Sequence, residues 1–321
     1  MIRYFVHREA ETRAADAIEP AWLLPGSGIT VWADVAEPTP DDGRVLASVF
    51  GLHELAVDDA MQTTHHPKVE TYGGVLYVVL HGINFHAEEH AFDTHDTDFF
   101  VTPQWLVTVH DGRRRSIAHV GDLCAKSDRF LAEGPVALMH RIVDTMMSHY
   151  LPEVDELEEW LDELERRVLE SPDQQLTGEI LAVKRDISAL RRIVIPQRDV
   201  VGRLARREFE QVGLEMSYRF RDIYDQLVRM ADDAMIFQDR VTGILDAHLA
   251  SVSNQLAQAS KLIAVVATLF GPLTVLTGLY GMNVPLPHLP GGEGAQFWWV
   301  VTLMAGASVT MFAWFRRSGW W

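Results

Sequence analysis

The sequence predicts an α+β domain, in which a mixed α/β sheet is joined to a long helical hairpin and a stalk helix, followed by two transmembrane α-helices. Three observations lead to this fold class. The first third contains short β-branched and aromatic runs, the middle shows long helical periodicities, and two uncharged apolar runs lie near the end. The chain has 321 residues, which is enough for two domains of ordinary size.

Residues 1–135 are predicted to form the mixed α/β domain. Its strands are expected in runs that are rich in β-branched and aromatic residues and bounded by Gly, Pro or Asp. These runs are Ile29–Val35, Val75–Ile83, Asp98–Val101 and Trp105–His110. Helical stretches near 41–50 and 53–62 lie between the first two strands.

One histidine motif in this domain matches a metal-protease pattern. Residues 86–90 read HAEEH, which fits H-x-x-E-H. That chemistry needs both histidines on one face of a helix. Here the motif follows an expected strand and lacks apolar helical periodicity, so we predict a polar hairpin tip.

The middle of the chain predicts a helical hairpin at residues 136–205 and a stalk helix at residues 206–261. Apolar residues at helical spacing mark the two hairpin arms. They are Val154, Leu157, Leu161, Leu164 and Val168 in the first arm, and Leu176, Ile180, Val183, Ile187, Leu190 and Val194 in the second. From Met216 to His248 apolar residues alternate at steps of four and three, which indicates a narrow seam along one long helix.

Charge is distributed very unevenly. The charged residues of segment 262–321 are Glu293, Arg316 and Arg317 alone. The first 261 residues therefore hold 26 basic and 44 acidic groups, a formal charge of −18. This acidity argues against nucleic acid as a partner, because phosphate binding needs clustered Lys and Arg. It suits inorganic cations, although it is also what solubility alone would require. A single cysteine, Cys124, excludes an internal disulfide framework and a multi-thiolate metal site.

The two apolar runs are long enough to cross a lipid bilayer. Residues 262–282 and 297–315 are uncharged and match the roughly 30 Å hydrocarbon layer. Lys261 precedes the first span and Arg316 and Arg317 follow the second, whereas the loop 283–296 has no Lys or Arg. The positive-inside rule therefore places the loop outside and both termini, including the tail 316–321, in the cytoplasm. The N-terminus has no apolar core like that of a signal peptide, so the first domain is also expected in the cytoplasm.

The first span carries a stripe of small residues at spacings of three and four. They are Ala257, Ser260, Ala264, Ala267, Gly271, Thr274, Gly278 and Gly281. Two helices cannot enclose a water-filled path by themselves, so transport would require an oligomer with this stripe around a central axis. Close helix packing of the small-xxx-small kind explains the stripe equally well, and the two interpretations can coexist.

Several aspartates could hold a hard cation. Asp58 and Asp59 end a helical stretch, and Asp222 and Asp225 lie beside the long apolar seam. Taken singly they are ordinary solvated carboxylates. Facing carboxylates of a neighbouring subunit, they would form an oxygen-only site of the kind that Mg²⁺ prefers.

The most specific motif is Tyr280-Gly281-Met282-Asn283 at the outer end of the first span. In a C-terminal two-span hairpin, this motif resembles the CorA family of divalent cation channels, whose signature is Gly-Met-Asn. The resemblance extends over nearly the whole chain. It includes the runs HHPKVETYGGVLYVVL, SPDQQLTGEILAVKRDISALRRIVIPQRDV, FRDIYDQL and the basic C-terminus.

The resemblance implies a funnel-shaped homopentamer that is not an enzyme and has no organic cofactor. It implies that the first span lines the pore and that Gly281, Met282 and Asn283 form its outer mouth. Mg²⁺ is implied as both the transported and the regulatory ion. Asp59 and Asp222 match positions at which aspartates of adjacent subunits bind regulatory Mg²⁺ in relatives. Asp58 matches a nearby acidic position, and Asp246 matches an acidic position low on the pore helix.

The chain also departs from well-known Mg²⁺-transporting members. It has Ala257 where they carry Asn, and Ser260 and Gly271 where they carry Met. The polar and apolar rings that those residues form in the inner pore are therefore absent from this sequence.

The leading hypothesis is uptake of Mg²⁺, and also of Co²⁺ or Ni²⁺, across the inner (cytoplasmic) membrane, gated by cytoplasmic Mg²⁺. Two alternatives stay open. The first is a zinc transporter, with or without proton coupling, because the loop pattern PGG…QFWW looks like that of ZntB-type transporters. The second is a membrane-anchored signalling coiled coil that has no pore.

Overall fold

The structure, a computed structural model, describes residues 2–62, 66–86, 91–112, 115–170, 173–282 and 292–318. The chain divides into two compact units, Met1–Leu245 and Asp246–Trp321. The first unit contains a mixed sheet and long helices, and the second contains two long apolar helices. The predicted fold class is therefore confirmed.

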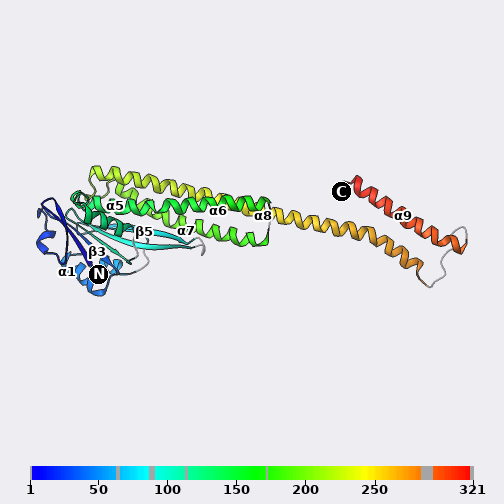
Figure 1. The fold of residues 1–321 in the computed structure, drawn as a ribbon, viewed down its shortest axis with the longest axis horizontal. Helices are drawn as coiled ribbons and strands as arrows, with labels where there is room; N and C mark the ends of the chain where they lie inside the picture. Colours follow the sequence, from blue (N-terminus) through cyan, green and yellow to red (C-terminus); the bar gives the residue numbers. More distant parts are fainter. Residues whose placement is uncertain are drawn as a thin grey trace. The chain divides into compact units, whose positions relative to one another are not determined.

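The described strands form one seven-stranded sheet in the order β2-β1-β3-β7-β6-β5-β4 (Figure 1). Their bounds are Ile2–Arg8 (β1), Glu11–Ala15 (β2), Thr30–Ala36 (β3), Lys68–Tyr72 (β4), Val75–His86 (β5), Ala91–Val101 (β6) and Trp105–His110 (β7). Neighbouring strands are antiparallel except β3 and β7, which run parallel with Val31 opposite Trp105. β5 and β6 form a hairpin that closes with His86 opposite Ala91. Strands therefore flank the HAEEH motif as predicted, although residues 87–90 themselves lie outside the described part.

The four predicted strands correspond to β3, β5, β6 and β7, and three others were not predicted. β6 begins at Ala91 rather than at Asp98, because its polar first half pairs with β5 along the whole hairpin. β1, β2 and β4 are short or rich in charged residues. β2 and β4 are the two edges of the sheet, where alternating polar side chains face water.

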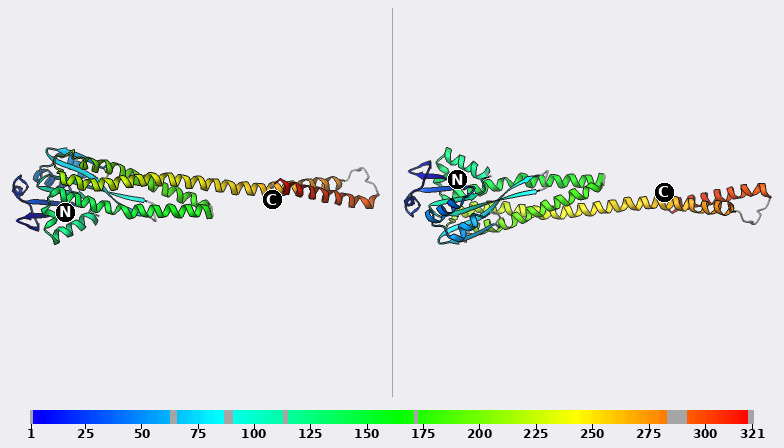
Figure 2. Two further views of the ribbon diagram at one scale, coloured as in Figure 1. Left: turned by 90° about the horizontal axis from the view of Figure 1, so that it is seen from above. Right: turned by 90° about the horizontal axis from the view of Figure 1, so that it is seen from below.

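Helices cover both faces of the sheet (Figures 1 and 2). A short 3-10 helix, Pro20–Leu23, precedes β3. α1 (Pro40–Val49) and α2 (Glu54–Ala60) pack on one face, against a cluster that includes Tyr77, Phe100 and Val107. α1 starts at a capping box in which Thr39 and Asp42 bond to each other's backbone N–H, with Pro40 in the first turn.

The opposite face is covered by a larger set of helices that share one apolar core with it. They are α3 (Arg115–Lys126), α4 (Arg129–Ala132), α5 (Pro135–Ser148), α6 (Tyr150–Glu170), α7 (Gln174–Ala205) and the first part of α8 (Leu214–Tyr280). The apolar seams expected in the two hairpin arms are buried in α6 and α7. The long helix begins at Leu214 rather than at about residue 206, because the chain first turns through Arg207, whose φ is 59°.

A buried hydrogen-bond network joins the sheet to the hairpin. The Tyr150 hydroxyl donates to the carbonyl oxygen of His81 at 2.8 Å, and Gln197 Nε2 donates to that hydroxyl at 2.6 Å. The backbone N–H of His81 in turn donates to Gln197 Oε1 at 3.0 Å. β5, α6 and α7 are thus held at one point by groups that have no access to water.

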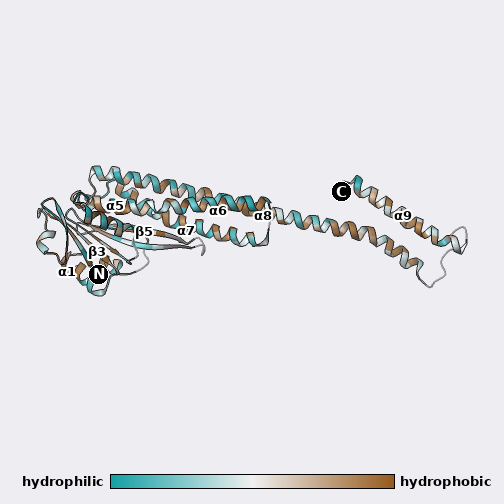
Figure 3. Ribbon diagram, in the orientation of Figure 1, coloured by the Kyte–Doolittle hydropathy of each residue, from teal (hydrophilic) through white to brown (hydrophobic). Residues whose placement is uncertain are grey.

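The second unit contains the last part of α8, from Asp246 to Tyr280, and α9 (Glu293–Arg317). α8 and Gly294–Arg317 are each long and apolar enough to cross a membrane, as the hydropathy colours show (Figure 3). Only 6% and 0% of their most apolar stretches are buried within the chain, so neither of these stretches lies in the core of a soluble domain. α8 contains residues 262–280 of the first predicted span, 262–282, and ends two residues before that span does, whereas α9 contains the whole of the second, 297–315.

Substitution of Gln197 tests the network between sheet and hairpin. Gln197→Leu should lower the free energy of unfolding by about 1–3 kcal/mol, because the N–H of His81 and the hydroxyl of Tyr150 lose buried partners. The exposed Ser188→Ala on the same helix is the control and should change it by less than about 0.5 kcal/mol. Denaturation of the purified protein compares the two, and equal effects would contradict a structural role of the network.

Candidate functional site

The small-residue stripe lies on one uncovered face of α8. Ala257, Ser260, Ala264, Ala267, Gly271, Thr274, Gly278 and Gly281 are all exposed in the single chain. The opposite face of the helix is more covered: Val265 is buried, and Leu269 and Leu276 are half-buried. At 100° per residue these two groups lie on nearly opposite sides of the helix. The two faces of α8 therefore have different surroundings within one chain.

Two glycines of the stripe, Gly271 and Gly278, are not required by contacts within the described chain. A Cβ atom added at Gly271 or at Gly278 would meet nothing within 4 Å. Neither glycine has a positive φ, so backbone conformation does not demand one either. Among the described residues nothing keeps this face small, so a closely packed neighbour or open space beyond them would explain the small side chains.

α8 ends where the Gly-Met-Asn signature begins. The N–H of Gly281 donates to the carbonyl oxygen of Thr277 at 2.9 Å, and a Cβ at Gly281 would come within 2.9 Å of that same oxygen. Glycine is therefore the residue that fits this helix end without displacing backbone. Met282 is 57% exposed, and Asn283 lies outside the described residues.

The candidate cation-binding aspartates are spread over two helices. Asp58 and Asp59 lie on α2, with Asp58 exposed and Asp59 half-buried, whereas Asp222 and Asp246 are exposed on α8. Asp59 already has a partner, because its carboxylate forms an ion pair with the ammonium of Lys68. Among the residues that the structure describes, no three His, Cys, Asp or Glu side chains gather so as to hold a metal ion.

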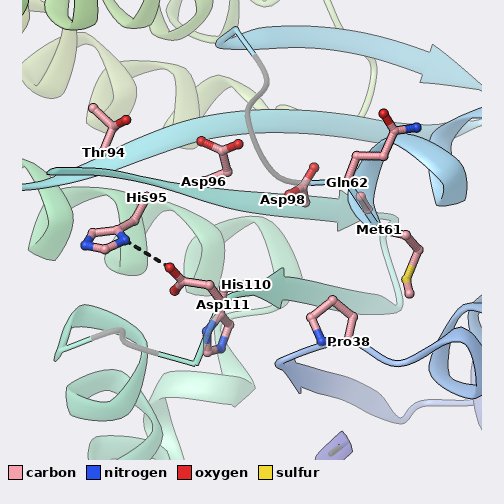
Figure 4. A pocket seen from close by; sticks show the side chains of 10 residues that line it. Pro38, Met61, Gln62, Thr94, His95, Asp96, Asp98, His110 and Asp111 are labelled. Carbon is pink, nitrogen blue, oxygen red and sulfur yellow. Dashed lines mark hydrogen bonds and ion pairs between the residues drawn. The ribbon is translucent and has the colours of Figure 1, made fainter.

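The structure also contains a cavity that the sequence did not reveal. It has a volume of about 120 Å³ and lies beside the paired strands β6 and β7 (Figure 4). Its lining includes Thr94, His95, Asp96, Asp98, His110 and Asp111. His95 Nδ1 and Asp111 Oδ2 are 2.9 Å apart. The sequence shows where these residues lie along the chain but not which of them are neighbours in space. The pairing register of β6 and β7 brings them together.

Asp98 is a buried carboxyl group in the lining of this cavity. It is 3% exposed and accepts a hydrogen bond of 2.5 Å from the Tyr77 hydroxyl. Burial raises the pKa of Asp98 to about 7, although the bond from Tyr77 acts in the opposite direction. The group therefore changes charge near neutral pH.

The pKa of a second buried carboxylate, Asp34, is shifted in the opposite direction, below its usual value. Its Oδ1 accepts from Thr108 Oγ1 at 2.8 Å and lies 2.9 Å from His110 Nε2, and its Oδ2 accepts from Arg3 at 2.6 Å. Burial would raise the pKa of Asp34, but the bonds and charge of His110 together with the bonds from Arg3 and Thr108 lower it. The N–H of Gly112 donates to His110 Nδ1, so the proton of a neutral His110 lies on Nε2, toward Asp34. These satisfied partners give Asp34 a structural role.

Comparison with known proteins identifies relatives over nearly the whole chain. The CorA-like Mg²⁺ transporter protein family matches residues 27–317. The chain is 29% identical over 290 residues to YfjQ of Bacillus subtilis, which covers 90% of this chain and 89% of that protein. It is 28% identical over 329 residues to the cobalt/magnesium transport protein CorA of Thermotoga maritima, covering 100% and 91%. The structure of the CorA magnesium transporter from Methanocaldococcus jannaschii superposes with a TM-score of 0.83 at 21% identity, covering 100% of this chain and 99% of that one.

The raised pKa of Asp98 predicts a pH-dependent stability. An unfolded Asp has a pKa of about 3.9, so the folded chain keeps a proton that the unfolded chain has lost. This contribution is fully present below about pH 4 and is lost as the pH rises to about 7. Asp98→Asn keeps an acceptor for Tyr77, and from pH 5 to pH 8 it should gain about 2–3 kcal/mol of stability relative to the wild type. Thermal unfolding at both pH values measures this difference, and an equal effect at both would contradict the assignment.

Proposed function

The chain belongs to the CorA family of divalent cation transporters, and on that premise we propose that five copies form a channel for Mg²⁺ that also admits Co²⁺ or Ni²⁺. The family is one of transporters and not of enzymes. One observation carries the proposal: the small-residue face of α8 is uncovered, whereas the opposite face is partly covered within the chain. Five such faces around an axis would line a continuous path, and α9 would lie outside them.

The pore is proposed to run along the first span of each subunit. Its lining is Ala257, Ser260, Ala264, Ala267, Gly271, Thr274 and Gly278, and Gly281, Met282 and Asn283 form its outer mouth. Lys261, Arg316 and Arg317 flank the spans on the side that the positive-inside rule assigns to the cytoplasm. Both termini and the acidic first unit therefore lie in the cytoplasm, beneath the inner membrane.

Selectivity at this mouth is proposed to act on a hydrated ion. Mg²⁺ sheds its water reluctantly, and a ring of neutral Asn283 carboxamides would hydrogen-bond to the water shell without removing it. The membrane potential would then draw the ion inward, at about 2.3 kcal/mol per charge per 100 mV. Zn²⁺ binds more readily to nitrogen and sulfur ligands. The proposed lining offers Met282 alone, with His288 in the loop, so a dehydrated Zn²⁺ would find few partners.

Cytoplasmic Mg²⁺ is proposed to hold the channel closed through aspartates at subunit interfaces. Asp59 of one subunit and Asp222 of the next, with Asp58 nearby, would share an ion, and Asp246 would add a carboxylate low on the pore helix. The first 261 residues of each chain carry a formal charge of −18, so crowded subunits repel one another. Loss of the bridging ions would loosen the interfaces, and α8, which belongs to both units, would transmit the change to the pore.

Flux of divalent cations through the purified oligomer tests this proposal. Proteoliposomes with an inside-negative potential should take up Mg²⁺, with Co²⁺ and Ni²⁺ competing for the same path. Absence of any divalent flux would contradict the proposed function. Uptake of Zn²⁺ in preference to Mg²⁺ would favour the zinc transporter alternative.

Asn283→Ala tests the proposed mouth. We expect Mg²⁺ flux to fall to background, because the alanine ring cannot hydrogen-bond to the water shell of the ion. The size of the oligomer should be unchanged, and size-exclusion chromatography with light scattering checks it. Asn254→Ala is a matched control, because Asn254 is exposed on α8 and lies outside the stripe and the mouth. Normal flux through Asn283→Ala would remove Asn283 from the mechanism.

A further inference from the structure

The ammonium of Lys68 lies in a cation-binding cradle formed by its own chain. Lys68 begins the edge strand β4, and its Nζ pairs with Asp59 Oδ2 from α2. The same Nζ lies 3.3 Å from Glu70 Oε2 and 5.1 Å from the centre of the Tyr77 ring. Two carboxylates and the face of an aromatic ring thus surround one positive charge, which is an arrangement that favours cations.

The fold fixes the parts of this cradle independently of Lys68. Glu70 stands directly opposite Tyr77 in the antiparallel pairing of β4 and β5, and Tyr72 donates a hydrogen bond of 3.0 Å to Glu70 Oε2. Tyr77 is fully buried and stacks on Phe100 with ring centres 4.6 Å apart. Asp59 is held by α2, whose neighbouring residues Val57 and Ala60 are buried. The cradle would therefore persist if the ammonium were removed.

Lys68 keeps its charge in this position. A lysine is charged at neutral pH, and the carboxylates of Asp59 and Glu70 beside its Nζ stabilise that ammonium form. The side chains of Lys68 and Asp59 are 27% and 31% exposed, so water screens their ion pair less than it would a fully exposed one. The Asp59 carboxylate therefore carries a permanent counter-ion from its own chain.

We propose that Lys68 is a tethered cation that competes with divalent cations for Asp59 and thereby sets the concentration at which cytoplasmic Mg²⁺ acts. This inference rests on the proposed function of Asp59 as an interfacial Mg²⁺ ligand. Mg²⁺ binds a carboxylate oxygen at about 2.0–2.1 Å and requires near-ideal octahedral geometry. An ammonium already on that carboxylate must move away before the ion binds, and its charge repels the ion until it does. Removal of the ammonium should leave a tighter site.

A double-mutant cycle tests this competition. Lys68→Met keeps the stem that lies on Tyr77 but removes the charge, and Asp59→Asn removes the contested ligand. Calorimetric titration of MgCl₂ into the full-length oligomer, and the inhibition of flux by Mg²⁺ on the cytoplasmic side, are measured for the wild type, both single variants and the double variant. We expect Lys68→Met to lower the half-saturating Mg²⁺ concentration roughly tenfold. In the double variant this shift should disappear.

Three further variants serve as controls for the effect of removing the charge of Lys68. Lys68→Arg keeps the charge and should leave the half-saturating concentration near that of the wild type. Arg44→Met removes the cation of an exposed pair with Asp41 in the same unit, and it should have no effect. Lys68→Gln is a second neutral substitution for the case that Lys68→Met does not assemble, and it should show the same shift.

The outcomes separate this inference from the proposed function. An unshifted Mg²⁺ dependence in both Lys68→Met and Lys68→Gln, or the same shift in the double variant, would overturn the competition. It would do so even if Asp59→Asn alone weakened Mg²⁺ inhibition, which would support Asp59 as a regulatory ligand. If the wild type conducted no divalent ion, the proposed function would fail, whereas an Asp59-dependent tightening of Mg²⁺ binding in Lys68→Met would still support the competition.

Discussion

A hydrated divalent cation crosses a bilayer only where protein replaces the hydrocarbon, and the two membrane helices of one chain cannot enclose such a path. Because of this constraint, the uncovered small-residue face of α8 is the candidate lining of such a path. Gly271 and Gly278 have no neighbour within the described chain that excludes a larger side chain, whereas the side of α8 that contains Val265 is partly covered. The span thus has one face that its own chain partly covers and one face that is exposed in the described chain.

The first unit combines a rigid interior with a strongly acidic surface. Its sheet is enclosed by apolar clusters on both faces, and Tyr150, Gln197 and the backbone of His81 satisfy one another where the helical hairpin meets the sheet. Asp34 is fully partnered, whereas Asp98 lies on a small cavity and has a pKa raised by burial to about 7. Lys68 offsets part of the negative charge at Asp59. Among the proposed cation ligands, Asp59 is thus already paired with a cation of its own chain.

Much of the fold could be predicted from the sequence because its signals are long and periodic. The uninterrupted apolar spans and the seam from Met216 to His248 indicate membrane and stalk helices without reference to any partner. Short edge strands such as β4 give no such signal, since their alternation of charged and apolar residues also fits a loop. The pairing of Lys68 with Asp59 and the cavity beside Asp98 depend on strand register and on the position of α2, which a linear pattern does not encode. Asp59 was singled out from the sequence as a candidate cation ligand, but its pairing with Lys68 and the buried Asp98 were not predicted.

The central claim, that the small-residue face of α8 lines the path of the ion, can be tested by cysteine modification. The native Cys124 is buried, so a thiol introduced into the span can be labelled against a low background. Thr274 lies on the stripe, and Leu276 lies at nearly the same depth on the opposite, half-buried face. The measurement is Mg²⁺ flux before and after a small charged thiol reagent is applied to Thr274→Cys and Leu276→Cys channels. We expect flux to be blocked in Thr274→Cys and unchanged in Leu276→Cys, and block at Leu276→Cys alone would contradict an ion path along the small-residue face.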